Sequence, residues 1–407
     1  MCTALTGVRR IAPVVRDRVV GGVRSGTPIG RTGDGSSVPD GAVPGPTRSS
    51  PPPPARRPSH RSRRWPLGSP GREDDPRING ELIDLRAGDY EARVATAGAT
   101  LVHLRRAGRD LVVPFDAETS LPCGWQGRAL VPWPNRVKDS RYTYGGEEYL
   151  LPCNEPETGS ALHGLVGWSD FQVASDTAAE DGTDEPEGDA PDDARQPLSE
   201  VALELSLPAS YGYPWALEVS VRFALDAVTG LTVTTTTTNV GAAVAAPHVP
   251  GAPEDDGGQL PAPYGVSAHP YLTRSVPLDE CVLTVPAATV LDADPESMAP
   301  AGRRPIEGTE WDWREGRPVG ETSTDNAYTG LPDGLWEVRL AGGEPGTVVM
   351  TAEAPWVQVY TGEHLFRRGV AVEPMTCPPN SFNTGDDLVT LAVGESHSFS
   401  YSLREDR

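Results

Sequence analysis

Two histidines far apart along the chain could take part in acid–base chemistry on a small polar substrate. His163 precedes Gly164, which allows another backbone to approach closely. His269 precedes Pro270, which biases the histidine toward an extended conformation that can project its ring from a strand end. An imidazole gains and loses a proton near neutral pH, so either residue could act as a general acid or base. A lone histidine is more often a hydrogen-bonded or surface side chain, so the surroundings of each histidine must decide whether it has a chemical role.

A carboxylate and a guanidinium complete this set of candidates. Glu373 follows the apolar run 370–372 and precedes Pro374, so we expect a half-buried carboxylate at a strand terminus. Burial raises the pKa of a carboxyl group and a neighbouring cation lowers it, so its basicity can be tuned. Taken alone, Glu373 is better explained by a structural ion pair with an arginine. Arg136 follows Asn135 in a turn-like setting and, taken alone, could be an ordinary surface charge.

The elements that must position these side chains are predicted to be β-strands. In residues 217–225 the five odd positions are apolar, and residues 231–234 follow after a turn, so the two runs predict a hairpin. No window combines helical periodicity with helix caps. Many short strands at close intervals predict an all-β fold, a large antiparallel β-sandwich. Similar runs lie at residues 201–207, 356–360, 370–372 and 399–403.

Composition divides the chain into two parts. Residues 1–76 are rich in Arg, Pro, Gly and Ser, and we expect a disordered N-terminal extension that buries too little apolar surface to fold. Residues 77–407 are predicted to form the β-sandwich domain. Two stretches interrupt it: an acidic surface loop near 176–195 and an insertion near 242–260.

Charge and motif content exclude several classes of function. The formal net charge of −22 argues against nucleic acid and anionic membranes as partners. No run approaches the roughly 20 apolar residues that a membrane span needs, and the N-terminus lacks an uninterrupted apolar signal region. The five scattered cysteines show no zinc-binding spacing, and the acidic loop lacks the order of a calcium loop. We therefore expect a cytoplasmic protein without a metal.

The order of the candidate residues resembles that of the aldose 1-epimerase (galactose mutarotase-like) family, in its divergent bacterial branch. The resemblance extends from about Ile78 to the C-terminus. It implies a large β-sandwich that binds a sugar. The motifs that carry it are, in chain order, Asn135-Arg136, the run 141–144, Asn154, Leu162-His163-Gly164, Trp168, Asn239, His269-Pro270-Tyr271, Asp325 within 324–328, and Glu373-Pro374.

The resemblance also implies roles for these residues. Glu373 would be the base that takes the proton of the C1 hydroxyl, and His269 the acid that protonates the ring oxygen. The ring opens, the C1–C2 bond rotates and the ring closes as the other anomer, without metal or cofactor. Trp133, Trp168 and Tyr271 are candidate platforms for the apolar face of the sugar, although core packing would explain any one of them equally well. The substrate-binding residues would be Asn135, Arg136, His163, Tyr271 and Asp325.

Other functions remain open at this point. A hexose 6-phosphate would need cations such as Arg136 and Arg274 to hold the phosphate. A non-catalytic carbohydrate-binding protein would need no acid–base pair. A glycosidase would need two carboxylates across a scissile bond, for which the sequence offers only scattered candidates. The oligomeric state cannot be predicted from these patterns.

Overall fold

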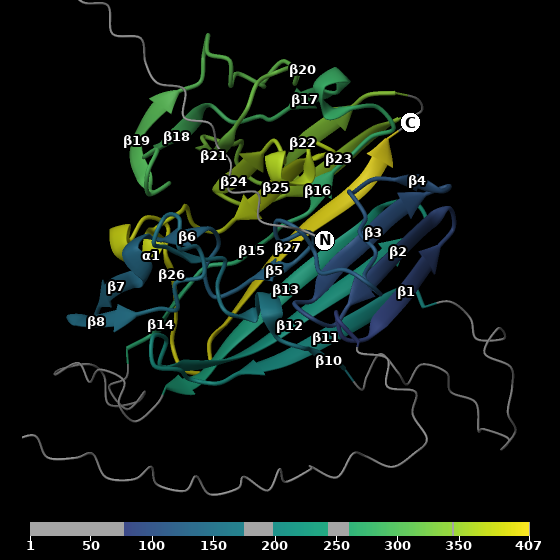
Figure 1. Cartoon of the computed structure of the whole chain (residues 1–407). Coiled ribbons are helices and arrows are strands. Elements are labelled where there is room, and N and C mark those ends of the chain that lie inside the picture. The colour runs from purple at the N-terminus through teal and green to yellow at the C-terminus, as the bar shows by residue number, and fades with distance from the viewer. Residues whose placement is uncertain (1–76, 175–197, 243–259, 344–345, 407) are drawn as a thin grey trace, which may run out of the picture. The chain divides into compact units, whose positions relative to one another are not determined.

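The computed structural model describes residues 77–174, 198–242, 260–343 and 346–406 (Figure 1). The predictions of a disordered segment at 1–76 and an acidic loop at 176–195 therefore fall outside the described residues. So does the predicted insertion at 242–260, apart from its two end positions.

The largest sheet of the described ranges is a nine-stranded antiparallel sheet, in which the yellow C-terminal strand forms one of the long arrows of Figure 1. The predicted hairpin is confirmed, because β12 (Trp215–Asp226) and β13 (Gly230–Ala242) pair along nearly their whole length. The odd positions of β12 from Leu217 to Leu225 are buried, as the period-two pattern requires. In spatial order the strands are β10 (Gln172–Val173), β11 (Glu200–Leu207), β12 (Trp215–Asp226), β13 (Gly230–Ala242), β27 (Ser396–Asp406), β23 (Thr347–Ala352), β22 (Trp336–Ala341), β17 (Val282–Thr284) and β20 (Arg317–Pro318).

A six-stranded antiparallel sheet carries three of the seven predicted site residues, Tyr271, Asp325 and Glu373. Its strands, in spatial order, are β16 (Tyr271–Leu272), β25 (Val370–Met375), β24 (Trp356–Tyr360), β21 (Asp325–Thr329), β18 (Thr289–Ala293) and β19 (Pro300–Pro305). A four-stranded sheet consists of β1 (Leu82–Ala87), β2 (Tyr90–Ala95), β3 (Thr100–Arg106) and β4 (Arg109–Asp110).

Short strand pairs and single helical turns complete the described elements. The pairs are β5 (Ala129–Leu130) with β15 (Ser267–Ala268), β6 (Arg136–Val137) with β9 (Ala161–Leu162), β7 (Arg141–Tyr144) with β8 (Glu147–Leu150), and β14 (Ala262–Tyr264) with β26 (Val389–Leu391). The helical turns are η1 (Lys138–Ser140), η2 (Val166–Trp168), η6 (Leu278–Glu280), η7 (Glu363–Leu365) and α1 (Ser381–Thr384). None of the helices in the described ranges has the length and apolar character that a bilayer crossing requires.

One continuous apolar core joins the three larger sheets. It contains Leu85 of β1, Phe223 of β12 and Val372 of β25, each nearly inaccessible to solvent. The all-β antiparallel fold predicted from the sequence is therefore confirmed.

The prediction that Glu373 stands at a strand terminus, half-buried, was wrong. Strand β25 continues through Glu373 and Pro374 to Met375, and Glu373 is only 1% exposed. Pro374 favours a strand end here, because proline cannot donate a hydrogen bond to a sheet. The neighbouring strand β16 pairs only with Val370 and Ala371, so proline does not interrupt a ladder with β16.

Candidate active site

Strand register brings the predicted acid and base into contact. Tyr271 pairs with Ala371 across β16 and β25, and the amide of Val372 donates to the carbonyl of Pro270. Continuing this register places His269 opposite Glu373. Their side chains meet there, with His269 Nε2 3.2 Å from Glu373 Oε1.

Burial changes the proton affinity of both groups. It lowers the pKa of His269 to about 3 and raises the pKa of Glu373 well above its ordinary value. A buried imidazolium is thus a stronger acid and a buried carboxylate a stronger base than either is in water. Glu373 Oε2 and His269 Nδ1 are buried and have no hydrogen-bond partner within the described residues. Such unpaired polar atoms are costly in a structural cluster and useful in a reactive one.

His163 is held as a hydrogen-bond donor beside this pair. Its ring meets that of His269 edge to face, with the centroids 5.2 Å apart. Its Nδ1 accepts the backbone N–H of Asn135 at 3.1 Å, and the Asn135 carbonyl accepts the His163 amide at 2.8 Å. Burial lowers the pKa of His163, so the ring is neutral and its proton must sit on Nε2. Both residues have positive φ, 53° and 61°, a strained conformation that is characteristic of functional sites.

The same hydrogen bond argues against a metal at this place. His163, His269 and Glu373 offer ligand atoms within 4.8 Å of one another. Because Nδ1 of His163 accepts the Asn135 amide, a metal would have to bind Nε2, which carries the proton. The arrangement therefore suits donation by His163 better than ligation.

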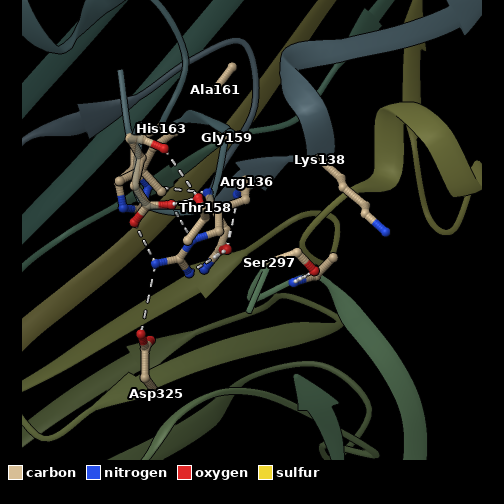
Figure 2. A network of polar contacts seen from close by, with 12 residues as sticks. Arg136, Lys138, Thr158, Gly159, Ala161, His163, Ser297 and Asp325 are labelled. Carbon is tan, nitrogen blue, oxygen red and sulfur yellow. Dashed lines mark hydrogen bonds and ion pairs between the residues drawn. The ribbon is translucent and has the colours of Figure 1, made fainter. Parts of the chain in front are cut away.

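Arg136 lies between a loop and the six-stranded sheet, as Figure 2 shows. Its Nε and Nη2 donate to both carboxylate oxygens of Glu155 at 2.7 and 2.8 Å, and its Nη2 lies 4.0 Å from Asp325 Oδ2. Thr158 also donates to Glu155. The fork of hydrogen bonds to Glu155 fixes the guanidinium plane and leaves Nη1, with only a long 3.5 Å contact to Asn135 Oδ1, as the more available donor.

Asp325 and Gln358 form the opposite wall. Gln358 pairs with Glu373 in the β24–β25 register, and its Nε2 donates to Asp325 Oδ1 at 2.7 Å. Burial raises the pKa of Asp325, although Arg136 and Gln358 act in the opposite direction. Gln358 Oε1 is buried without a hydrogen-bond partner among the described residues. Asp325 and Gln358 line a hollow of the surface together with Asn135 and Arg136.

A family model for aldose 1-epimerases matches residues 81–248 and 254–404. The chain belongs to the aldose 1-epimerase family. Membership assigns it to isomerases that act on sugars and confirms the family resemblance drawn from the sequence.

Relatives and solved structures agree with this assignment. The chain is 35% identical over 331 residues to the uncharacterized protein YihR of Escherichia coli, covering 81% of this chain and 94% of YihR. A putative aldose 1-epimerase of E. coli is similar in structure, with a TM-score of 0.62 at 22% identity, over 80% of this chain and 99% of that one. The galactose 1-epimerase of Lactobacillus acidophilus gives 0.61 at 17% identity, over 83% and 97%. Similarity at this level of identity establishes the shared fold.

Six of the seven predicted site residues converge in this family member's site, and Tyr271 lies just behind them. The Tyr271 ring stacks on His269 with centroids 5.0 Å apart, and its hydroxyl donates to the Gly124 carbonyl. Tyr271 is only 2% exposed, so it packs against the His269 imidazole from inside the protein. The converging residues are Asn135, Arg136, His163, His269, Asp325 and Glu373.

Other residues singled out in the sequence have structural roles or lie elsewhere. Trp133 is buried against Phe382, which is a core contact. Asn154 bonds the backbone of Leu162 and so supports the strand before His163. Asn239 likewise bonds the Leu391 carbonyl. Arg274, considered for a phosphate, is ion-paired to Glu405 and lines a different hollow.

Glu155 and Gln358 were missed by sequence reasoning. Gln358 had a usable signal, because it is the one polar residue in the middle of the apolar strand Trp356–Tyr360. Glu155 had none, since a glutamate in a polar loop is ordinarily solvated.

Proposed function

We propose that the protein is an aldose 1-epimerase that interconverts the α and β anomers of a hexose. The observation that carries the proposal is the buried contact between His269 Nε2 and Glu373 Oε1, ringed by Arg136, His163 and Asp325. A carboxylate and an imidazole are the two groups that this reaction needs, and the family acts on sugars.

The ring-opening step uses the state in which His269 is protonated and Glu373 is ionised. Burial disfavours this ion pair in the empty site, so the polar groups of the bound sugar must stabilise it. Glu373 takes the proton of the C1 hydroxyl while His269 gives its proton to the ring oxygen. The bond between C1 and the ring oxygen breaks, and C1 becomes a carbonyl. Rotation about C1–C2 and the reverse proton transfers close the ring as the other anomer.

Burial assists the ring-opening step. It lowers the pKa of His269 to about 3 and raises that of Glu373, so the transfer converts two buried charges into two neutral groups. Arg136 and the Nε2–H of His163 donate to sugar oxygens, and Asp325 accepts from sugar hydroxyls. The direct 3.2 Å contact between His269 Nε2 and Glu373 Oε1 allows a proton to pass between the two groups.

The charges around the pair favour an uncharged hexose such as glucose or galactose. Arg136 is the cation of the site, and Glu155 already binds it through two hydrogen bonds. Asp325 and Glu373 lie beside it. A phosphate on the sugar would meet this acidic surrounding with no cation left unpaired among the residues that form the site. A cytoplasmic location belongs to the same proposal.

The test is proton exchange spectroscopy or polarimetry on freshly dissolved α-glucose, α-galactose and glucose 6-phosphate. The proposal expects faster anomerisation of the uncharged hexoses than of the phosphate. Saturable sugar binding in calorimetry, without any change in anomerisation rate, would instead identify a non-catalytic carbohydrate-binding protein.

A further inference from the structure

A buried arginine close to the candidate active site has no ion-pair partner among the described residues. Arg128 is 1% exposed, and its Nε and Nη1 have no hydrogen-bond partner within the described residues. Its backbone carbonyl accepts the amide of His269. An unpaired buried guanidinium destabilises a fold unless another group compensates its charge.

The compensating group is the indole of Trp168. The Arg128 guanidinium carbon lies 3.9 Å from the centre of that ring, a close cation–π contact. The contact covers one face of the indole, yet Trp168 remains 57% exposed. An indole that is held by a guanidinium and still more than half exposed is suited to stacking against the apolar face of a sugar ring.

Trp168 is linked to the catalytic pair by consecutive ring contacts. Its centroid lies 5.4 Å from that of Trp125, and Trp125 lies 5.0 Å from His163. His163 in turn contacts His269 at 5.2 Å. The exposed indole therefore belongs to the same row of packed rings as His163, two ring contacts away from it.

The backbone conformation around this row of rings leaves space for the side chains. Trp125 has a φ of 62°, which is strained for a bulky residue. A Cβ at Gly167 would lie 2.6 Å from Cζ3 of Trp125, and one at Gly98 would lie 2.6 Å from Nη1 of Arg128. Two glycines thus make room for the indole and the guanidinium, at a cost in chain entropy that a surface tryptophan alone would not require.

We propose that Trp168, supported by Arg128, forms a second sugar subsite that receives the non-reducing ring of a reducing disaccharide. The proposal rests on the proposed function, which places the reducing ring at His269 and Glu373. The enzyme then anomerises the reducing end of a disaccharide with a lower KM than that of the single hexose.

The experiment compares maltose with glucose in exchange spectroscopy on the full chain. The wild type is expected to show a KM for maltose about five- to tenfold below that for glucose, and Trp168→Ala to remove this ratio. Tyr211→Ala, which removes an 86% exposed aromatic elsewhere, serves as the matched control and should keep the ratio. Equal KM values in the wild type, or a ratio unchanged in Trp168→Ala, would overturn the subsite while leaving the epimerase proposal intact.

A binding measurement separates the subsite from catalysis. Methyl maltoside cannot mutarotate, so saturation-transfer NMR with this probe reports contact alone. We expect saturation of the non-reducing ring in the wild type and in Tyr211→Ala, and its loss in Trp168→Ala. If the wild type accelerates neither sugar, the epimerase proposal fails, and the methyl maltoside result alone then decides whether Trp168 is a sugar subsite. Absence of saturation in the wild type would overturn it.

Discussion

Two buried carboxylates in this protein have opposite surroundings. Glu405 accepts from Arg109 Nη2 at 2.7 Å and from Arg274 Nη1 at 3.0 Å, so both of its oxygens are paired. Glu373 contacts His269 through one oxygen and leaves the other unpaired among the described residues. Both side chains are almost inaccessible to solvent.

The surroundings push their pKa values in opposite directions. Burial raises the pKa of Glu373 well above its ordinary value, and the charge of Arg136 does not offset this. Burial would also raise the pKa of Glu405, but the hydrogen bonds from Arg109 and Arg274 outweigh it and hold the pKa below the ordinary value. A carboxylate with every oxygen paired stabilises the fold, whereas one left partly unpaired is available for proton transfer.

The largest effect is expected at Glu373. Glu373→Gln keeps the shape of the side chain but removes the base, so the epimerase activity should fall by about 10²- to 10⁴-fold. The midpoint of thermal unfolding should stay the same or rise, because the variant no longer buries an ionisable group. Exchange spectroscopy and a thermal melt measure the two quantities. Wild-type activity in this variant would remove Glu373 from the role of base.

The matching change at Glu405 should lower the stability of the fold instead of the epimerase activity. Glu405→Gln leaves the buried Arg274 without its carboxylate, and we expect the free energy of unfolding to fall by roughly 3–5 kcal/mol. Urea unfolding measures it. Glu200→Gln, which breaks an exposed ion pair with Arg222, should cost less than about 1 kcal/mol. If both variants lose equal stability, the buried ion pair of Glu405 contributes no more to the fold than an exposed one does.

A smaller effect is expected at Glu155, a paired carboxylate that holds an arginine of the candidate active site. Glu155→Gln loosens the fork that orients Arg136, so kcat/KM should fall by about 10- to 100-fold. Glu148→Gln, which breaks an exposed pair with Arg141, should leave kcat/KM unchanged. A normal kcat/KM in Glu155→Gln would show that Arg136 is positioned without it.

The smallest effect is a pH dependence of stability from His269. Its pKa is about 3 when folded and about 6.5 when unfolded, so the unfolded chain binds more protons between these values. The stability from this group is present above pH 6.5 and is lost as the pH falls toward 3. The raised pKa of Glu373 acts with the opposite sign, losing stability as the pH rises above about 4.5. On raising the pH from 5 to 7, the urea midpoint should shift upward in the wild type relative to its shift in His269→Asn, where only Glu373 of this pair titrates. Equal shifts in the two proteins would contradict this assignment.

Much of the fold could be predicted from the sequence because its signals are local. The alternation of residues 217–225 depends on neighbouring side chains facing opposite sides of a sheet, and β12 follows it. The end of the strand that carries Glu373 was misjudged, because Pro374 reads as a terminator when the extent of the neighbouring strand is unknown. The roles of Glu373 and His269 remain proposals, but the structure brings the two side chains into contact.

The sequence by itself determined which chemical groups are available and that they sit on or beside short antiparallel strands. Only the tertiary structure decided that His269 stands opposite Glu373, that Glu155 binds Arg136, and that Arg128 lies beneath Trp168. The reason is physical. Alternation and turn chemistry act between residues near in sequence, whereas register, burial and the resulting pKa shifts arise only when distant strands pack together.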